Sequence, residues 1–160
     1  MFNHQSINPG KVLFINASPN RDGNTAAMGK KLLNGIDFDQ INLVDYKIYQ
    51  IGQNFSDDQF EEVYQKMAMA DTIVLGTPTY WHEMSGFLKT LIERIGQYPD
   101  QTGLKGKNIA LIMQGAFPMD GVKETDAIIK RFCSVGKMNY VGSAGSSMAI
   151  SNLRSRLGIN

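Results

Sequence analysis

The chain passes from an apolar strand into a helix through the segment Ile15-Asn16-Ala17-Ser18-Pro19-Asn20-Arg21-Asp22-Gly23-Asn24-Thr25. Backbone N–H groups at the start of a helix lack intrahelical partners and lie at the positive end of the helix dipole, so they bind phosphate. Four side chains add hydrogen-bond donors and a fifth adds a guanidinium: Ser18, Asn20, Asn24, Thr25 and Arg21. Because the same residue types also form plain turns and helix caps, the segment predicts either a phosphate loop or a capped turn.

Length, charge and cysteine content narrow the class of protein. The 160 residues suffice for one substantial core, and the 16 basic and 15 acidic residues leave a net charge of +1, which gives no field to attract nucleic acid or an anionic membrane. Residues 1–10 lack a signal-peptide apolar run, and no stretch has the length of a membrane span. The single cysteine, Cys133, can form neither an intrachain disulfide nor a thiolate metal site. We expect one cytoplasmic domain over residues 1–160, with an N-terminal extension (1–10), a C-terminal tail (151–160) and no metal.

Apolar runs and helical spacings alternate along the chain. Residues 12–15, 73–75 and 109–113 are apolar without a period of two, which is typical of strands buried on both faces, and weaker strands fit 38–44 and 138–142. Helices are predicted over 24–35, after a capping box at Ser56 and Gln59, over 84–95 before Gly96, and over 121–135. The alternation predicts an α/β fold with a five-stranded parallel sheet and helices on both faces, and five strands permit the doubly wound order 2-1-3-4-5.

Three loops, 17–25, 77–83 and 114–121, should meet at the carboxyl ends of these strands, where ligands of such sheets bind. The second holds the chain's only tryptophan, Trp81, beside Tyr80, which favours a wall for a flat aromatic ligand. The third begins with small residues that let a ligand edge approach the main chain, and Phe117 offers a further wall. The alternative for both loops is that their rings pack in the core. His82 suits capping, packing or a hydrogen bond to a ligand better than proton transfer. We nominate no catalytic side chain.

Other phosphate chemistries lack their required residues. A dinucleotide loop needs three spaced glycines where only Gly23 occurs, and the spacing from Gly23 to Gly29-Lys30 is one residue too long for a P-loop. A cysteine phosphatase would need its nucleophile in the loop, whereas Cys133 falls on a predicted helix. A phosphoacceptor would need acidic residues at the strand ends. The remaining hypothesis is a phosphate carried by a ligand with a flat ring.

Two motifs in this order resemble the flavodoxin-like NAD(P)H-dependent FMN reductase family. They are Ser18-Pro19-Asn20-Arg21 through Gly23-Asn24-Thr25, and Gly76-Thr77-Pro78-Thr79-Tyr80-Trp81 leading to Ser85-Gly86-Phe87-Leu88-Lys89 and Ile92-Glu93-Arg94. The resemblance spans about residues 11–142. The chain is most similar to the flavin domain of iron-sulfur flavoproteins, but residues 48–55, where their cysteine cluster would fall, contain no cysteine. The resemblance therefore implies a reductase that depends on FMN alone.

The resemblance also implies roles for particular residues. Ser18, Asn20, Arg21, Asn24 and Thr25 would hold the FMN phosphate. The flavin ring would lie between two groups of residues, Pro78, Thr79, Tyr80 and Trp81 on one side and Gln114, Gly115, Ala116 and Phe117 on the other. Gln114-Gly115-Ala116 departs from the Thr-Gly-Gly that is frequent in the family.

The implied activity is hydride transfer from NADPH or NADH to FMN and on to a quinone-like or other small-molecule acceptor. One alternative is a flavodoxin-type electron carrier without its own NAD(P)H activity; another is a flavin-free binding module on the same fold. The resemblance further implies a homodimer or homotetramer, with residues 97–103 and the tail after Ser151 as candidate contact regions.

Overall fold

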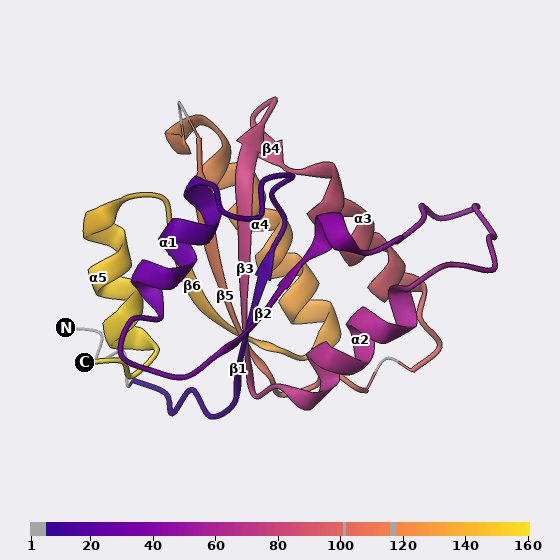
Figure 1. Cartoon of the computed structure of the whole chain (residues 1–160). Helices are drawn as coiled ribbons and strands as arrows, with labels where there is room; N and C mark the ends of the chain where they lie inside the picture. Colours follow the sequence, from indigo (N-terminus) through magenta and orange to yellow (C-terminus); the bar gives the residue numbers. More distant parts are fainter. Residues whose placement is uncertain (1–5, 101, 116–117) are drawn as a thin grey trace.

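The computed structural model describes residues 6–100, 102–115 and 118–160, which form a six-stranded sheet with helices on both faces (Figure 1). The strands are β1 Val12–Asn16, β2 Asp39–Asn42, β3 Thr72–Tyr80, β4 Glu83–Met84, β5 Asn108–Gln114 and β6 Asn139–Ala144. Five are parallel in the order β2-β1-β3-β5-β6, and the short β4 pairs with β3 in the antiparallel sense. The predicted order 2-1-3-4-5, which lacked β4, is confirmed.

Alternating side chains of the central strands supply apolar surface to both faces of this sheet. On β1, Val12 and Phe14 pack in one core cluster, and Leu13 and Ile15 pack in the other. The first cluster is covered by α1 (Asn24–Leu32) and α5 (Ser147–Arg156), and the second by α2 (Phe60–Met69), α3 (Gly86–Gln97) and α4 (Pro118–Gly136). A 3-10 turn, η1 (Leu43–Asp45), follows β2. The helices therefore lie on both faces, as the sequence predicts.

Phe14 brings α1 close to the sheet through two glycines. A Cβ atom at Gly29 of α1 would lie 2.3 Å from Phe14 Cζ, and one at Gly76 of β3 would lie 2.6 Å from Phe14 Cε2. The same Cβ at Gly76 would be 3.0 Å from Thr25 Cγ2, so the first turn of α1 also lies against β3. Larger residues at these two positions would push α1 off the sheet, because protein interiors are close-packed.

Several elements differ from the sequence prediction. β3 continues through Tyr80 and forms a hairpin with β4, so most of the predicted loop 77–83 is strand. The capping box at Ser56 is wrong: α2 begins after Gln59, whose side chain instead accepts a hydrogen bond from the Lys47 N–H. The expected tail 151–160 lies largely in α5, which begins after Ser146 and packs on α1.

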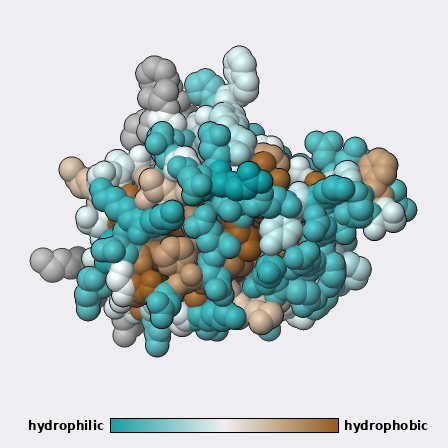
Figure 2. Space-filling model, in the orientation of Figure 1, coloured by the Kyte–Doolittle hydropathy of each residue, from teal (hydrophilic) through white to brown (hydrophobic). Residues whose placement is uncertain are grey.

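The surface seen from the side of Figure 1 is mostly hydrophilic, with apolar residues showing between polar ones near its middle (Figure 2). The segment 46–59 projects from this body at the right of Figure 1, and it includes the half-exposed apolar residues Ile51 and Phe55. None of the helices in the described part of the chain combines the length and the hydropathy that a membrane crossing requires.

Candidate functional site

Asn16, the last residue of β1, shapes the loop that follows it. Its Nδ2 donates to the carbonyl oxygens of Asn20 and Arg21, both at 3.3 Å, and to Asn42 Oδ1 at 3.0 Å. Its Oδ1 accepts from the Ser18 N–H at 3.1 Å, and the residue is fully buried. One buried amide thus holds the loop from inside. Our sequence analysis missed this role, although an asparagine at a strand end before a turn is a recognisable signal.

Within this loop the predicted phosphate residues divide into an inner and an outer pair. Ser18 and Thr25 are buried, and Ser18 Oγ accepts from the Asn20 N–H at 3.1 Å. Asn20 and Asn24 are exposed. The two hydroxyl-bearing residues are therefore buried, and the two amide-bearing residues are exposed to solvent.

The N-terminus of α1 is open. Its N-cap residue is Gly23, which has no side chain to cap the first turn, and that turn contains no acidic residue. Most helices fill this position with Ser, Thr, Asp or Asn. A helix start without a side-chain cap and without an acidic residue in its first turn keeps its N–H groups and dipole available to an anion, which fits a phosphate monoester.

Arg21 points away from this helix start. Its Nε lies 2.6 Å from Asp45 Oδ1 on η1, and the two side chains form an ion pair with about 61% and 36% of their surfaces exposed. The hydrogen bond to Asp45 raises the pKa of the guanidinium. The structure thus does not bring Arg21 together with Ser18 and Thr25 around the helix start.

The end of β3 and the predicted third loop, 114–121, meet at Thr79. Pro78 of β3 is in register with Gln114 of β5, so the two loops start side by side. A Cβ atom at Gly115 would lie 3.1 Å from Thr79 Cβ, and one at Gly121 would lie 2.7 Å from Thr79 Cγ2. These glycines allow the close approach. Ala116 and Phe117 lie outside the described residues.

The Thr79 hydroxyl is a buried polar atom with no hydrogen-bond partner among the described residues. Such a group costs about 1–3 kcal/mol when it stays unpaired, so native structures rarely leave one without a reason. A polar edge of a bound ring would satisfy this hydroxyl. The unpaired hydroxyl and the open helix start, both at the strand ends, together fit a ligand that carries a ring and a phosphate.

Ser85 locks the first loop to the hairpin. Its hydroxyl donates to the Ala17 carbonyl oxygen at 2.7 Å, and its N–H donates to Thr77 Oγ1 at 2.9 Å. Its Oγ also accepts from the Leu88 N–H and thereby caps α3. Ser85 and Thr77 are fully buried. Our sequence analysis included Ser85 only as part of a motif, because its bond to Ala17 spans distant parts of the chain.

Tyr80 and Trp81 stand at the rim of the site. Trp81 is 98% exposed and Tyr80 is 47% exposed. Trp81 and His82 have φ angles of 48° and 65°, so the β3–β4 hairpin turns through two left-handed residues, a geometry that usually selects Asn and Gly. The predicted aromatic wall is therefore an exposed hairpin tip rather than a ring packed in the core.

Metal and thiol chemistry find no support in the described residues. No group of three or more His, Cys, Asp or Glu side chains there is arranged to hold a metal ion. Cys133 is buried on α4, and burial raises the pKa of its thiol to about 12, which leaves it protonated and unreactive at neutral pH.

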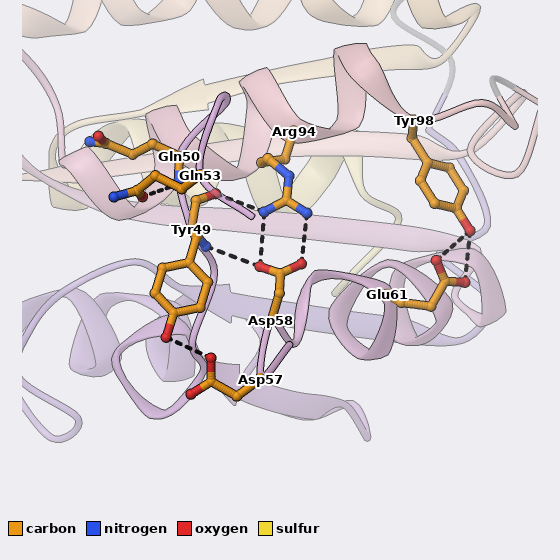
Figure 3. A network of polar contacts seen from close by, with 8 residues as sticks. All are labelled: Tyr49, Gln50, Gln53, Asp57, Asp58, Glu61, Arg94 and Tyr98. Atoms are coloured by element: carbon orange, nitrogen blue, oxygen red, sulfur yellow. Dashed lines mark hydrogen bonds and ion pairs between the residues drawn. The ribbon is translucent and has the colours of Figure 1, made fainter. Parts of the chain in front are cut away.

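A polar network joins the segment 46–59 to α3 (Figure 3). Arg94 makes two bonds to the Asp58 carboxylate, at 2.9 and 2.7 Å, and a third to the Tyr49 carbonyl oxygen at 2.7 Å. The Arg94 guanidinium holds the pKa of Asp58 below its usual value. The network fixes the segment in which the resemblance would have placed a cysteine cluster.

Two hollows on the surface are relevant to ligand or partner binding. One, of about 350 Å³, lies beside the first loop and the hairpin and is lined by Pro19, Gln50, Tyr80, Ser85, Gly86, Phe87 and Thr90. The other is an apolar groove of about 500 Å³ along α3 and α4, away from the loops.

Comparison with known proteins finds flavin-dependent proteins by family model and by sequence. A family model described as NADPH-dependent FMN reductase matches residues 10–152. An iron-sulfur flavoprotein of Methanocaldococcus jannaschii is 31% identical over 146 residues, covering 82% of this chain and 76% of that protein. A putative NAD(P)H-dependent FMN-containing oxidoreductase of Bacillus subtilis is 30% identical over 95 residues, covering 54% and 52%. The solved structure of the Trp repressor binding protein from Bacillus subtilis matches with a TM-score of 0.68 at 21% identity, covering 92% and 95%, which shows the fold.

Proposed function

Because the chain belongs to the NADPH-dependent FMN reductase family, we propose that it oxidises NADPH or NADH and reduces a quinone-like or other small-molecule acceptor, with FMN as its cofactor. One observation carries the proposal: the uncapped N-terminus of α1 and the Thr79 hydroxyl, which has no partner among the described residues, lie at the same edge of the sheet. A phosphate satisfies the first and a ring edge satisfies the second. We place the reaction in the cytoplasm, where NAD(P)H is available.

The phosphate of FMN would lie at the start of α1. There Ser18, Asn20, Asn24 and Thr25 would add hydrogen bonds to those of the open N–H groups. Arg21 would join them only by leaving Asp45, so we give it a secondary role.

The ring would lie between the hairpin and the third loop. Pro78, Thr79, Tyr80 and Trp81 would contact it from one side, and Gln114 and Gly115, with Ala116 and Phe117, from the other. FMN, when bound, supplies the hydride and electron chemistry, so no protein acid or base is required. The chain binds and orients the cofactor, and its exposed hairpin tip leaves room for a second molecule.

Absorption spectroscopy with NAD(P)H tests this function. We expect the purified protein to bind FMN and to oxidise NADPH or NADH when an acceptor is present. A protein that stays colourless after addition of FMN would refute the proposal. If the protein binds FMN but NAD(P)H does not bleach it at a useful rate, the protein is a flavodoxin-type carrier instead.

We also propose a homodimer, or a homotetramer built from two dimers, that forms through the groove along α3 and α4. Its lining is mostly apolar, and Val135 is 63% exposed there. Asp100 and Arg131 line the same groove, so a second copy related by a two-fold axis can pair the two charges across the interface.

Light scattering should give at least twice the chain mass of 17.8 kDa. Val135→Glu should yield monomers, whereas Met148→Glu on α5, also at an exposed apolar residue, should not.

A further inference from the structure

The hollow of about 350 Å³ beside the hairpin has the chemistry of a site for a small flat ligand. Pro19, Tyr80 and Phe87 give it one aliphatic and two aromatic walls, and the rings of Tyr80 and Phe87 are 47% and 39% exposed. None of the described residues that line it is charged. Its volume lies near the lower end of the usual range for small-molecule pockets.

Gln50 and Thr90 are two of the polar side chains that line this hollow. Neither the Gln50 amide nor the Thr90 hydroxyl makes a hydrogen bond within the described part of the chain. Both can donate to a ligand. The hollow therefore offers flat apolar faces together with two donors, which suits an uncharged ring that carries carbonyl oxygens. It suits a dinucleotide poorly, because no cation is present to meet the pyrophosphate.

Gln50 is held in place by the network of Figure 3. The Tyr49 carbonyl oxygen accepts from Arg94, and the Tyr49 N–H donates to Asp58 Oδ1 at 3.1 Å. The Gln50 N–H itself donates to Gln53 Oε1 at 2.8 Å. The backbone before and at Gln50 is thus fixed to α3 and to its own turn. Without these contacts, the Gln50 side chain would move with the projecting segment.

We propose that this hollow binds the electron acceptor, an uncharged one- or two-ring quinone, with Gln50 and Thr90 donating hydrogen bonds to its carbonyl oxygens. The proposal rests on the function given above, because the hollow shares Tyr80 with the proposed ring site and Pro19 with the phosphate loop. In the net reaction, NAD(P)H gives a hydride and solvent gives a proton. Both quinone C=O groups become C–OH groups, and NAD(P)⁺ is released. Arg94 is a positioning residue that acts through Gln50.

The test compares two acceptors in the FMN-loaded protein. 1,4-Naphthoquinone has the two carbonyl groups, whereas ferricyanide is an anion that takes single electrons and needs no such contacts. In Gln50→Ala and Thr90→Val we expect the KM for naphthoquinone to rise about 3- to 10-fold, as the loss of one hydrogen bond implies. The rate with ferricyanide and the affinity for FMN should not change. The control Gln65→Ala, on α2, should change neither the KM for naphthoquinone nor the rate with ferricyanide.

Calorimetry without NAD(P)H gives a second readout that does not depend on turnover. Naphthoquinone should bind the wild-type protein and bind both variants more weakly by the same factor. Unchanged KM and Kd values in both variants would overturn the proposal while leaving the reductase function intact. A protein that fails to oxidise NAD(P)H would refute the reductase function. In that case the calorimetric comparison still decides whether the hollow binds a quinone.

Discussion

The Ser85 hydroxyl donates a hydrogen bond to the Ala17 carbonyl oxygen, at 2.7 Å, from the position that caps α3. Together with the bond from its N–H to Thr77, this buried residue joins the α1 loop, the hairpin and α3. The loops at the strand ends are usually the mobile part of such a sheet, but here two of them share an internal bond. The geometry offered to a ligand is therefore held by the protein before the ligand arrives.

Replacement of Ser85 tests this connection. In Ser85→Ala the helix loses its cap and the Ala17 carbonyl oxygen stays buried without that partner, so the free energy of unfolding should fall by about 2–3 kcal/mol. Ser146→Ala is the matched control, because Ser146 caps α5 at an exposed site and should cost about 1 kcal/mol. Urea denaturation measures both. Equal losses in the two variants would show that the bond to Ala17 contributes nothing.

A single added charge tests the phosphate site. Asn24→Asp places a carboxylate in the first turn of α1, which should leave the FMN-free protein as stable as before or slightly more stable. The same charge repels a phosphate, so the affinity for FMN should fall at least about 10-fold, as expected for about 1.4 kcal/mol. Fluorescence titration should show no such loss for riboflavin, which lacks the phosphate. Asn152→Asp on α5 is the control. A parallel loss for riboflavin would place the phosphate elsewhere.

Two buried hydroxyls without a hydrogen-bond partner among the described residues permit a matched comparison. Thr79→Val and Thr125→Val each remove a buried hydroxyl without a partner, so each should leave the FMN-free protein equally stable or more stable by about 1 kcal/mol. Only Thr79→Val should weaken FMN binding, because only Thr79 lies between the hairpin and the third loop. If both variants bind FMN like the wild type, the Thr79 hydroxyl does not contact the ring.

The Arg94–Asp58 pair predicts a pH dependence of stability. The guanidinium lowers the pKa of Asp58 in the folded protein, so the pair stabilises the fold above the carboxyl's unfolded pKa of about 4. That contribution is lost as the pH falls through the lowered folded pKa. Asp58→Asn should therefore cost about 2 kcal/mol at pH 7, and the difference from wild type should shrink toward pH 2–3.

Urea midpoints at pH 7 and pH 3 measure this difference. The exposed Lys47–Asp57 pair is the control, and Asp57→Asn should have a much smaller effect at pH 7. A cost of Asp58→Asn that stays the same at both pH values would contradict the assignment.

The sheet could be predicted because its central strands consist of uninterrupted apolar residues that only a two-sided core accommodates. The continuation of β3 could not, since Thr77 and Pro78 resemble the start of a loop and are strand only because they lie beside Met113 and Gln114. The start of α2 was predicted wrongly because the Gln59 side chain bonds to Lys47 instead of closing a box with Ser56. α5 has few inward residues, and its packing on α1 reveals it.

Some residues of the candidate site could be predicted from the sequence, and others could not. Motif residues could be named from the sequence, and their assignment to FMN stays a prediction. Asn16 and Ser85 were missed as organisers because their partners, Asn42 and Ala17, are distant in sequence. Gln50 was missed because the contacts that hold its segment beside the hairpin, such as the Arg94–Asp58 pair, join residues that are distant in sequence.

We expect the strand ends of this chain to hold FMN by both its phosphate and its ring. Titration of the FMN-free protein with FMN, followed by flavin absorption and fluorescence, tests it most directly. The titration should saturate at one FMN per chain, and riboflavin should bind much more weakly. A protein that leaves the flavin spectrum unchanged, or that binds riboflavin as tightly as FMN, would contradict it.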